Sequence, residues 1–443
     1  MKIAVVGAGI SGLGAALALG ETHDVQVFEA DTRVGGHANT VDAVFPDGVQ
    51  PVDTGFIVYN YRNYPNLTAL FDRLGVATKW SDMSFGFSLR GGQVEYACDN
   101  LNTLFAQRWR IADLRHISGL RQIKRFIETG PAELESGRLA GLSLSDWLAG
   151  QGFTDWFRER FILPMGSAIW STSSGKILDF PAEHFLRFFC NHDLMTGLNP
   201  AQRWRTVEGG SRAYVGRVRD WLGDRITTGQ AVVSVTGGAQ PSLRLADGSV
   251  VAADHILLAC HGPQAQALLT DAPDSLRQVL SAFRTSQNRA ILHSDPSLMP
   301  RLRRVWSSWN FLSDGMETEA ESPAQVTYWM NRLQSIPADR PLFVSLNPRH
   351  APDPALTHGA YDYAHPLFDA DSFAAQQALE RLQGQGGLWF AGAWLGYGFH
   401  EDGLRAGLRV AAALGARPDW AKDLVGPQGT GAAAEGGHVR AAE

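Results

Sequence analysis

Hydrophobic and polar positions follow two different periods along the chain, and the first thirty residues show them most clearly. Ile3 to Val6 form a short apolar run, and Val25 to Glu29 alternate between apolar and polar residues, as two strands would. Residues 9–20 lie between them, are rich in alanine and leucine, and begin and end at a glycine, which predicts a helix. The chain therefore begins with a strand, a turn, a helix and a second strand.

The later patterns divide the chain into helical and strand-rich blocks. Gly91-Gly92 and Asp247-Gly248 are typical turn sequences between strands. The predicted blocks are a helix within 61–80 that Gly75 stops, a hairpin over 85–96, a mainly helical region from 100 to about 219, strand-rich segments over 226–260 and 283–347, strands at 304–311 and 326–330, and a strand, loop and helix over 388–414.

The turn after the first strand has the spacing of a phosphate-binding loop. Gly7 permits a sharp turn, Gly9 has no side chain to keep a pyrophosphate from the backbone, and Gly12 allows the helix to pack closely on the sheet. The helix N-terminus would direct its amides at the phosphates. Glu29 lies 22 residues after Gly7, where a carboxylate would accept hydrogen bonds from ribose hydroxyls. The pattern predicts a bound dinucleotide; the alternative is a similar unit with an empty crevice.

Further motifs identify which dinucleotide is expected. An Arg-x-Gly-Gly segment, Arg33 to Gly36, follows Glu29 closely, and related motifs occur at 52–56, 231–235 and 388–407. In these segments the chain resembles the flavoprotein superfamily of amine oxidases, phytoene-type desaturases and protoporphyrinogen oxidases. The resemblance implies FAD, and the flavin loop has no cysteine for a covalent link, so we expect non-covalent binding.

The same resemblance implies a fold and a set of cofactor contacts. The expected class is α/β: a discontinuous Rossmann-type FAD-binding domain with a βαβ unit and a β-meander, beside an α+β substrate domain with a mixed sheet and a helical part. Residues 1–60, 220–282 and 385–417 would form the FAD domain, 61–219 and 283–384 the substrate domain, and 418–443 a disordered tail. The expected FAD contacts are Gly7, Ala8, Gly9, Ile10, Ser11, Gly12, Glu29, Ala30, Arg33, Gly35, Gly36, His37, Thr54, Gly55, Phe56, Val232, Gly392, Ala393, Glu401, Asp402, Gly403 and Leu404.

Composition narrows the class of protein further. The 443 residues are 44% hydrophobic and carry a net charge of −6, which gives no reason to expect a nucleic-acid partner. Three widely spaced cysteines provide no CxxC pair, and no His/Cys/Asp/Glu group has metal-ligand spacing, so we expect no metal. We find no signal peptide before the first strand and no apolar run of the roughly 18 to 20 residues that span a bilayer. We expect a cytoplasmic protein, or one that lies peripherally on the inner face of the cytoplasmic membrane.

The segment from Leu101 to Ile127 combines bulky apolar residues with six basic ones. Such a composition is compatible with a helix that lies at an interface and contacts anionic lipid headgroups. The alternative is a substrate-domain helix that packs inward and keeps its charges in solvent, and periodicity alone does not separate the two.

The C-terminal loop contains most of the candidate catalytic side chains. Glu401 or Asp402 would hydrogen-bond ribityl or pyrophosphate-side groups, although Asp402 is equally suited to cap the following helix. The amides of Gly403 and Leu404 would face the isoalloxazine ring. Trp394, Tyr397 and Phe399 do not align with the aromatic pair of amine oxidases, and none of the five lysines falls in the strand context of their water-binding lysine.

Histidines are the other candidates for acid–base chemistry. His37 and His400 lie in flavin-loop motifs, and His184 and His192 flank an aromatic helical segment. Any of them would be a possible base, but a single histidine is more often structural. The low-ranked catalytic candidates are His37, Tyr397, His400 and Glu401.

Three segments resemble one bacterial group within the superfamily. These segments are 35–40, 305–311 and 327–334, and the group is often associated with cyclopropane-fatty-acid-synthase-like methyltransferases and includes the desaturase of furan fatty acid biosynthesis. The resemblance implies an FAD-dependent oxidoreductase, acting on CH–CH groups, that desaturates a methylated or unsaturated fatty acyl chain of a membrane phospholipid by proton abstraction and hydride transfer to flavin N5. Oxygen or a quinone would accept the electrons. The alternatives are a soluble amine or porphyrinogen oxidase, and a non-redox isomerase or lipid-binding flavoprotein.

Overall fold

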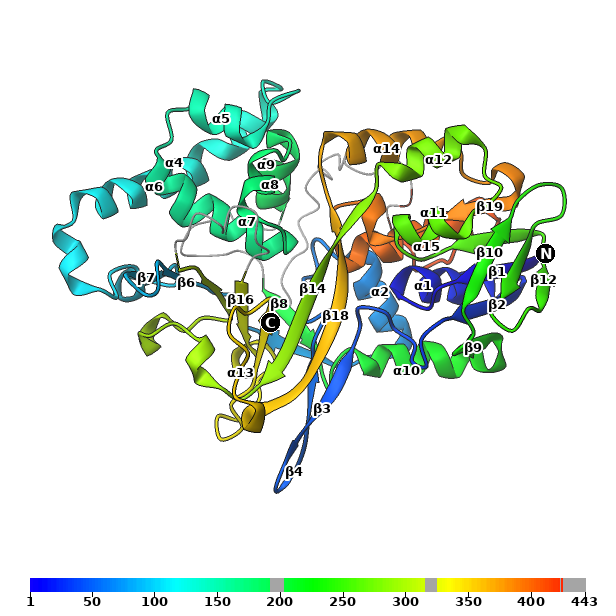
Figure 1. Ribbon diagram of the computed structural model, residues 1–443, viewed down its shortest axis with the longest axis horizontal. Helices are drawn as coiled ribbons and strands as arrows, with labels where there is room; N and C mark the ends of the chain where they lie inside the picture. Colours follow the sequence, from blue (N-terminus) through cyan, green and yellow to red (C-terminus); the bar gives the residue numbers. More distant parts are fainter. Residues whose placement is uncertain (192–202, 315–324, 423, 425–443) are drawn as a thin grey trace.

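The computed structural model describes residues 1–191, 203–314, 325–422 and 424 (Figure 1). His192 and residues 425–443 of the expected disordered tail lie outside these ranges. Disorder from residue 418 onward is contradicted for the first part of that tail, because Ala421 and Leu424 are buried in the main core. The backbone amide of Lys422 also donates to Asn66 Oδ1 at 2.7 Å, which fixes this segment to the fold.

A five-stranded parallel sheet carries the glycine turn and confirms the predicted α/β class. Its strand order is β19-β13-β1-β2-β9, so strands from the beginning, middle and end of the chain lie side by side. The antiparallel strands β10, β11 and β12 form the expected meander between β9 and β13. The bounds are β1 Lys2–Val6, β2 Asp24–Glu29, β9 Ile226–Thr228, β10 Val232–Thr236, β11 Ser242–Leu245, β12 Val250–Ala252, β13 His255–Leu258 and β19 Leu388–Phe390.

Helices α1 and α15 pack against each other beside this sheet (Figure 1). Every residue of α1 is buried, which explains why its sequence contains only small and apolar residues. Helices α2 and α10 also pack on this pair, and α11, α12 and α14 lie at the top of the same half of the molecule (Figure 1). The bounds are α1 Ile10–Leu19, α2 Pro65–Leu74, α10 Arg212–Leu222, α11 Gly262–Leu268, α12 Asp274–Ser281, α14 Ala370–Glu380 and α15 His400–Ala413.

A seven-stranded mixed sheet forms the second half of the fold. Its order is β18-β14-β17-β16-β15-β6-β7, and the long strands β14 and β18 run down the centre of the molecule (Figure 1). β15 and β6 are parallel, and the other neighbouring pairs are antiparallel. The bounds are β6 Phe85–Leu89, β7 Val94–Ala97, β14 Arg284–His293, β15 Trp309–Leu312, β16 Gln325–Trp329, β17 Phe343–Leu346 and β18 Thr357–Leu367, with the short helix α13 Met330–Leu333 after β16. Strands β3 Thr40–Phe45 and β4 Gly48–Asp53 pair with each other in a separate antiparallel hairpin.

A helical region with an aromatic core of its own lies beyond β6 and β7. Phe126 lies at its centre, with its ring centroid 5.5 Å from that of Phe157 and 5.8 Å from that of Phe189. Aromatic contacts of this kind add to the burial of apolar area. The bounds are α3 Leu101–Leu104, α4 Leu114–Glu135, α5 Leu144–Gly150, α6 Asp155–Phe157, α7 Leu163–Trp170, α8 Ser174–Leu178 and α9 Ala182–Asn191.

Three of the sequence predictions need correction. The helix within 61–80 ends at Gly75, which has a φ of +63°, as the glycine at this position predicts. The strand β5 (Thr78–Ser81) follows and pairs with β8 (Trp204–Val207), and β8 contradicts the mainly helical region predicted up to about residue 219. The strand at 304–311 begins only at Trp309. The segment from Leu101 to Ile127 is not one helix, because Asp113 accepts hydrogen bonds from two amides and starts α4 anew.

Gly119 on α4 provides a test of packing in the helical region. A Cβ at this position would lie 1.9 Å from the Trp156 ring, so Gly119→Ala should lower the free energy of unfolding by about 1–3 kcal/mol. In α10, a Cβ at Gly216 meets nothing within 4 Å, so Gly216→Ala should be neutral or stabilise the helix by up to about 1 kcal/mol. Urea unfolding of both variants measures the difference; equal effects would contradict the close approach of α4 to Trp156.

Candidate functional site

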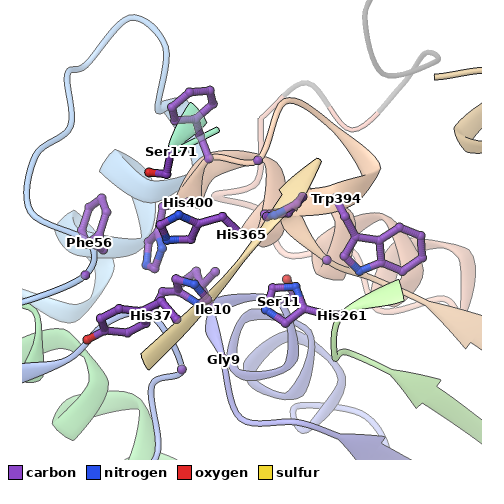
Figure 2. A pocket seen from close by; sticks show the side chains of 18 of the residues that line it. Gly9, Ile10, Ser11, His37, Phe56, Ser171, His261, His365, Trp394 and His400 are labelled. Atoms are coloured by element: carbon purple, nitrogen blue, oxygen red, sulfur yellow. The ribbon is translucent and has the colours of Figure 1, made fainter. Parts of the chain in front are cut away.

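A cavity of about 670 Å³ extends from the glycine turn to the mixed sheet. This volume lies in the range of small-molecule sites. Gly9, Ile10 and Ser11 at the start of α1 line one part of it, and four histidines gather around them (Figure 2). Trp309 and Tyr328 line the part of the cavity that is formed by the mixed sheet.

The glycine turn has the geometry that a pyrophosphate requires. Gly7 has a φ of +105°, and a Cβ there would lie 2.8 Å from the carbonyl oxygen of Ala259. A Cβ at Gly12 would lie 2.0 Å from the carbonyl oxygen of Gly7, so this glycine allows the close approach of helix and strand. A Cβ at Gly9 meets no protein atom within 4 Å and would instead fill the cavity. The absence of a side chain at Gly9 therefore serves the cavity rather than the packing of the chain.

Two charged residues lie beside this turn. Glu29 lines the cavity at the end of β2 and accepts hydrogen bonds from the amides of Ala8, at 2.7 Å, and Asp31, at 2.9 Å. Arg33 donates to the carbonyl oxygen of Gly36 at 2.9 Å, and its buried Nη1 has no hydrogen-bond partner among the described residues. Burying a guanidinium nitrogen without a hydrogen-bond partner costs free energy, and an anionic ligand would provide that partner.

A cluster of histidines adjoins the turn. The ring centroid of His37 lies 5.6 Å from that of His261 and 5.5 Å from that of His365. Burial lowers the pKa of all three, to about 4 for His365, so they are neutral at neutral pH. Within the described residues, His37 Nε2 and His261 Nδ1 are buried and lack hydrogen-bond partners. These nitrogens are available to a polar ligand in the cavity.

His400, another candidate, is held by its two neighbours. Its ring stacks on Phe56 at a centroid distance of 3.9 Å, and its Nε2 lies 2.6 Å from the hydroxyl of Tyr214. Burial lowers the pKa of His400 to about 3. The side chain is therefore a neutral, oriented wall of the cavity, and its basicity is too low for an efficient base at neutral pH.

The two carboxylates at the start of α15 do not contact the cavity. Glu401 accepts hydrogen bonds from the amides of Asn66 and Leu67, at 3.0 and 2.9 Å, which joins α15 to α2. Burial raises the pKa of Glu401 to about 7. Asp402 accepts from the amides of Tyr397 and Phe399, both at 3.0 Å, as the capping alternative predicted. The expectation that these side chains bind ribityl or pyrophosphate-side groups therefore disagrees with their contacts.

Most of the other predicted site residues do come together. Of the catalytic candidates, Tyr397 lines the cavity with His37 and His400; its hydroxyl lies 3.2 Å from His184 Nδ1, and burial raises its pKa. Ala8, Gly12, Arg33 and Gly35 do not line the cavity, and Gly403 and Leu404 pack against α1. The predicted cofactor contacts that line the cavity are Gly7, Gly9, Ile10, Ser11, Glu29, Ala30, Gly36, His37, Thr54, Gly55, Phe56, Val232, Gly392 and Ala393.

Sequence reasoning missed the apolar part of the cavity. Tryptophan is abundant in the segments expected to form the substrate domain, but the sequence does not show whether these residues line a channel or form a core. No motif marks which of them would meet. Among the lining residues, Glu29 is the single Asp, Glu, Lys or Arg. The apolar lining consists of Ile57, Val58, Met83, Phe85, Ile169, Trp170, Phe188, Trp204, Ala290, Trp309, Tyr328, Val344, Leu346, Pro366, Phe368 and Phe399.

Comparison with known proteins decides the family. The model of the flavin containing amine oxidoreductases matches residues 10–294. The chain belongs to this family. No curated protein sequence matches the chain significantly.

Solved structures share the fold of this chain over almost its whole length. Putrescine oxidase bound to putrescine is 18% identical with a TM-score of 0.65, covering 94% of this chain and 100% of the other. The fatty acid isomerase from P. acnes that produces CLA is 15% identical with a TM-score of 0.64, covering 91% and 96%. Cyclohexylamine oxidase from Brevibacterium oxydans IH-35A is 18% identical with a TM-score of 0.65, covering 93% and 98%.

The residues around the glycine turn fit the flavin cofactor that the family implies. The open space at Gly9, the unpartnered nitrogen of Arg33 and the unpartnered histidine nitrogens are all suited to an anionic dinucleotide such as FAD. Gly9 and the amides at the start of α1 would hold the pyrophosphate, and Glu29 the ribose. No described helix is long and apolar enough to cross a membrane.

Gly9→Val tests the cofactor site. Because a Cβ at Gly9 would meet no protein atom within 4 Å and would lie in the cavity, the variant should fold with an unchanged Tm in the FAD-free form, yet fail to bind FAD. Flavin absorbance after gel filtration measures the bound cofactor. A stable variant that remains yellow would contradict the placement of the pyrophosphate at this turn.

The buried histidines predict a pH dependence of stability in the FAD-free protein. Their pKa values are below the unfolded value of about 6.5, so the unfolded chain binds more protons as pH falls and stability is lost. Between about pH 7 and pH 5, His365 and His400 should each lower the free energy of unfolding by about 2 kcal/mol. Urea unfolding at each pH measures the slope.

His365→Gln is the control for this pH dependence. Between about pH 7 and pH 5, the free energy of unfolding of this variant should decrease by about 2 kcal/mol less than that of the wild type, because glutamine does not titrate. Bound FAD should also make the free energy of unfolding less sensitive to pH, because its phosphates favour the protonated histidines. A slope that neither change alters would show that other groups cause the acid instability.

Proposed function

We propose that this flavoprotein is an FAD-dependent oxidoreductase that dehydrogenates a methylated or unsaturated fatty acyl chain of a membrane phospholipid. The observation that carries the proposal is the apolar, uncharged wall that continues from the cofactor end of the cavity to the mixed sheet. Bound FAD would accept the hydride equivalent, while the proton leaves to a base and oxygen or a quinone reoxidises the flavin.

The apolar wall suits an alkyl chain. Trp170, Trp309 and Tyr328 come from α7, β15 and β16 and contribute large apolar surfaces to one cavity. Each methylene that leaves water for such a site contributes about 0.8 kcal/mol, so a chain of several carbons would bind without any ionic contact. These side chains would also exclude water from the reacting C–H bond.

The charge distribution disfavours a cationic substrate. No Asp or Glu lines the apolar wall in the described structure, so a second ammonium group, such as putrescine carries, would be buried there without a counter-ion. The sheet also contributes no lysine to the cavity, in agreement with the absence of the amine-oxidase lysine context. An amine oxidase is therefore the weaker alternative.

The P. acnes isomerase supports a second candidate function. Its name gives a fatty acid as the molecule it acts on, and it shares the fold of this chain. An isomerase would move a double bond and leave the substrate with the same mass. A dehydrogenase would remove hydrogen and leave the flavin reduced.

Anaerobic absorbance spectroscopy tests the proposal. Vesicles rich in methyl-branched or unsaturated acyl chains should bleach the oxidised-flavin bands of the FAD-loaded protein. Vesicles with saturated straight chains are the control and should leave the bands unchanged. Bleaching by an amine, or isomerisation without bleaching, would contradict the proposal.

Met83→Lys tests the apolar wall. Met83 lines the cavity and is only half-buried, so the substituted protein should fold and retain FAD. The ammonium group would be poorly solvated beside an alkyl chain, and binding of the acyl substrate should weaken by about tenfold or more. Met83→Leu is the matched control and should bind as the wild type does. Unchanged acyl affinity in Met83→Lys would place the chain elsewhere.

A further inference from the structure

Four large apolar side chains are exposed together at one end of the helical region. Leu101, Trp109, Ile111 and Leu114 have exposed fractions of 67%, 62%, 59% and 80%. They lie within fourteen residues, in the light-blue to cyan segment at the left edge of Figure 1. Scattered exposed apolar residues are ordinary, but four large ones within fourteen residues of the chain are suited to an interaction surface.

Hydrogen bonds hold this segment as one rigid corner. The Arg108 guanidinium donates to the carbonyl oxygens of Asn102 and Phe105, which ties the 3₁₀ turn at Arg108–Ala112 back to α3. His116 Nε2 lies 3.2 Å from the carbonyl oxygen of Leu104, which ties the first turn of α4 to α3. The exposed side chains therefore project from a fixed framework.

Basic residues surround the apolar ones. Arg108 and Arg115 are exposed within the corner, and Arg303 and Arg304 are exposed on the 3₁₀ turn at Arg303–Val305. Val305 packs directly against Ala97 and Ala106, so this second turn adjoins the corner.

The acidic residues nearby have partners. Asp113 pairs with Arg110 at 3.0 Å and accepts from the amides that begin α4. Glu95 is buried and accepts from the amides of Arg301 and Leu302. The outward charge of the corner is therefore positive.

We propose that this corner docks the protein on an anionic phospholipid bilayer. Trp109, Ile111 and Leu114 would enter the interfacial layer, and the arginines would contact lipid phosphates. The rest of α4 does not take part through its apolar face, because Ile123 and Phe126 are buried in the aromatic core. This inference rests on the proposed function, because docking would give an enzyme that acts on phospholipids its contact with the substrate. Docking itself can be measured without turnover.

Vesicle sedimentation of the FAD-loaded full chain tests the proposal. The protein should sediment with vesicles of phosphatidylcholine mixed with phosphatidylglycerol, and less with phosphatidylcholine alone. Added salt should release it, because screening weakens contacts between arginines and phosphates. A wild-type protein that stays in the supernatant with anionic vesicles at low salt would overturn the proposal, whatever its activity on acyl chains.

Paired variants locate the surface. Trp109→Ser with Leu114→Ser should abolish sedimentation, whereas Val44→Ser with Val49→Ser, on the exposed β3–β4 hairpin, should not change it. Arg115→Gln with Arg304→Gln should weaken partitioning about thirtyfold, at roughly fivefold for each lost basic contact. Arg381→Gln with Arg417→Gln, two exposed arginines away from the corner, should have no such effect.

Each variant should keep its Tm and its bound FAD, so that a loss of sedimentation reports the surface. Full sedimentation of the Trp109→Ser, Leu114→Ser protein would overturn the proposal. So would a loss confined to the hairpin variant, which would move the membrane contact to β3 and β4. A dehydrogenase that fails to sediment would leave the proposed function standing, and a protein that sediments without dehydrogenating would leave the docking surface standing.

Discussion

The close contact between α1, β1 and α15 is the constraint on which the rest of the structure depends. It is made by glycines: a Cβ at Gly12 would lie 2.0 Å from the carbonyl oxygen of Gly7, and one at Gly407 would lie 2.1 Å from that of Ser11. Because no side chain separates these backbones, the N-terminus of α1 opens directly into the cavity. The same contact brings Tyr397, in the loop before α15, and His400, the first residue of α15, to the cavity wall.

Polar groups around the cavity are arranged for an anionic ligand at one end and an apolar ligand at the other. At the cofactor end, burial lowers the pKa values of His37 and His365, so these histidines are neutral at neutral pH. The sheet end offers aromatic and aliphatic side chains without ionic groups. An enzyme that brings a flavin against a C–H bond of a lipid would need both properties in a single cavity.

The sequence predicted the local parts of this arrangement well. The glycine spacing and Glu29 identified the turn because backbone conformation and close approach restrict the residue type at each position. The segments assigned to the interrupted FAD domain each carry a motif, and strands from the beginning, middle and end of the chain lie in one parallel sheet.

Long-range contacts were less accessible from the sequence. Glu401 looked like a cofactor ligand, but its partners are the amides of Asn66 and Leu67, more than 330 residues earlier in the chain. Leu101 to Ile127 looked like one helix because composition does not show that Asp113 restarts it. The exposed corner and the apolar wall each depend on which residues tertiary packing leaves uncovered, and periodicity carries no such information.

Mass spectrometry of the acyl chains after a single anaerobic turnover tests the central claim most directly. The FAD-loaded protein would be mixed with an equimolar amount of methyl-branched phospholipid, so that no acceptor other than the flavin is present. The account predicts that one acyl chain loses a pair of hydrogen atoms for each flavin reduced. Acyl chains of unchanged mass beside an oxidised flavin would contradict it and would favour a non-redox role for the cofactor.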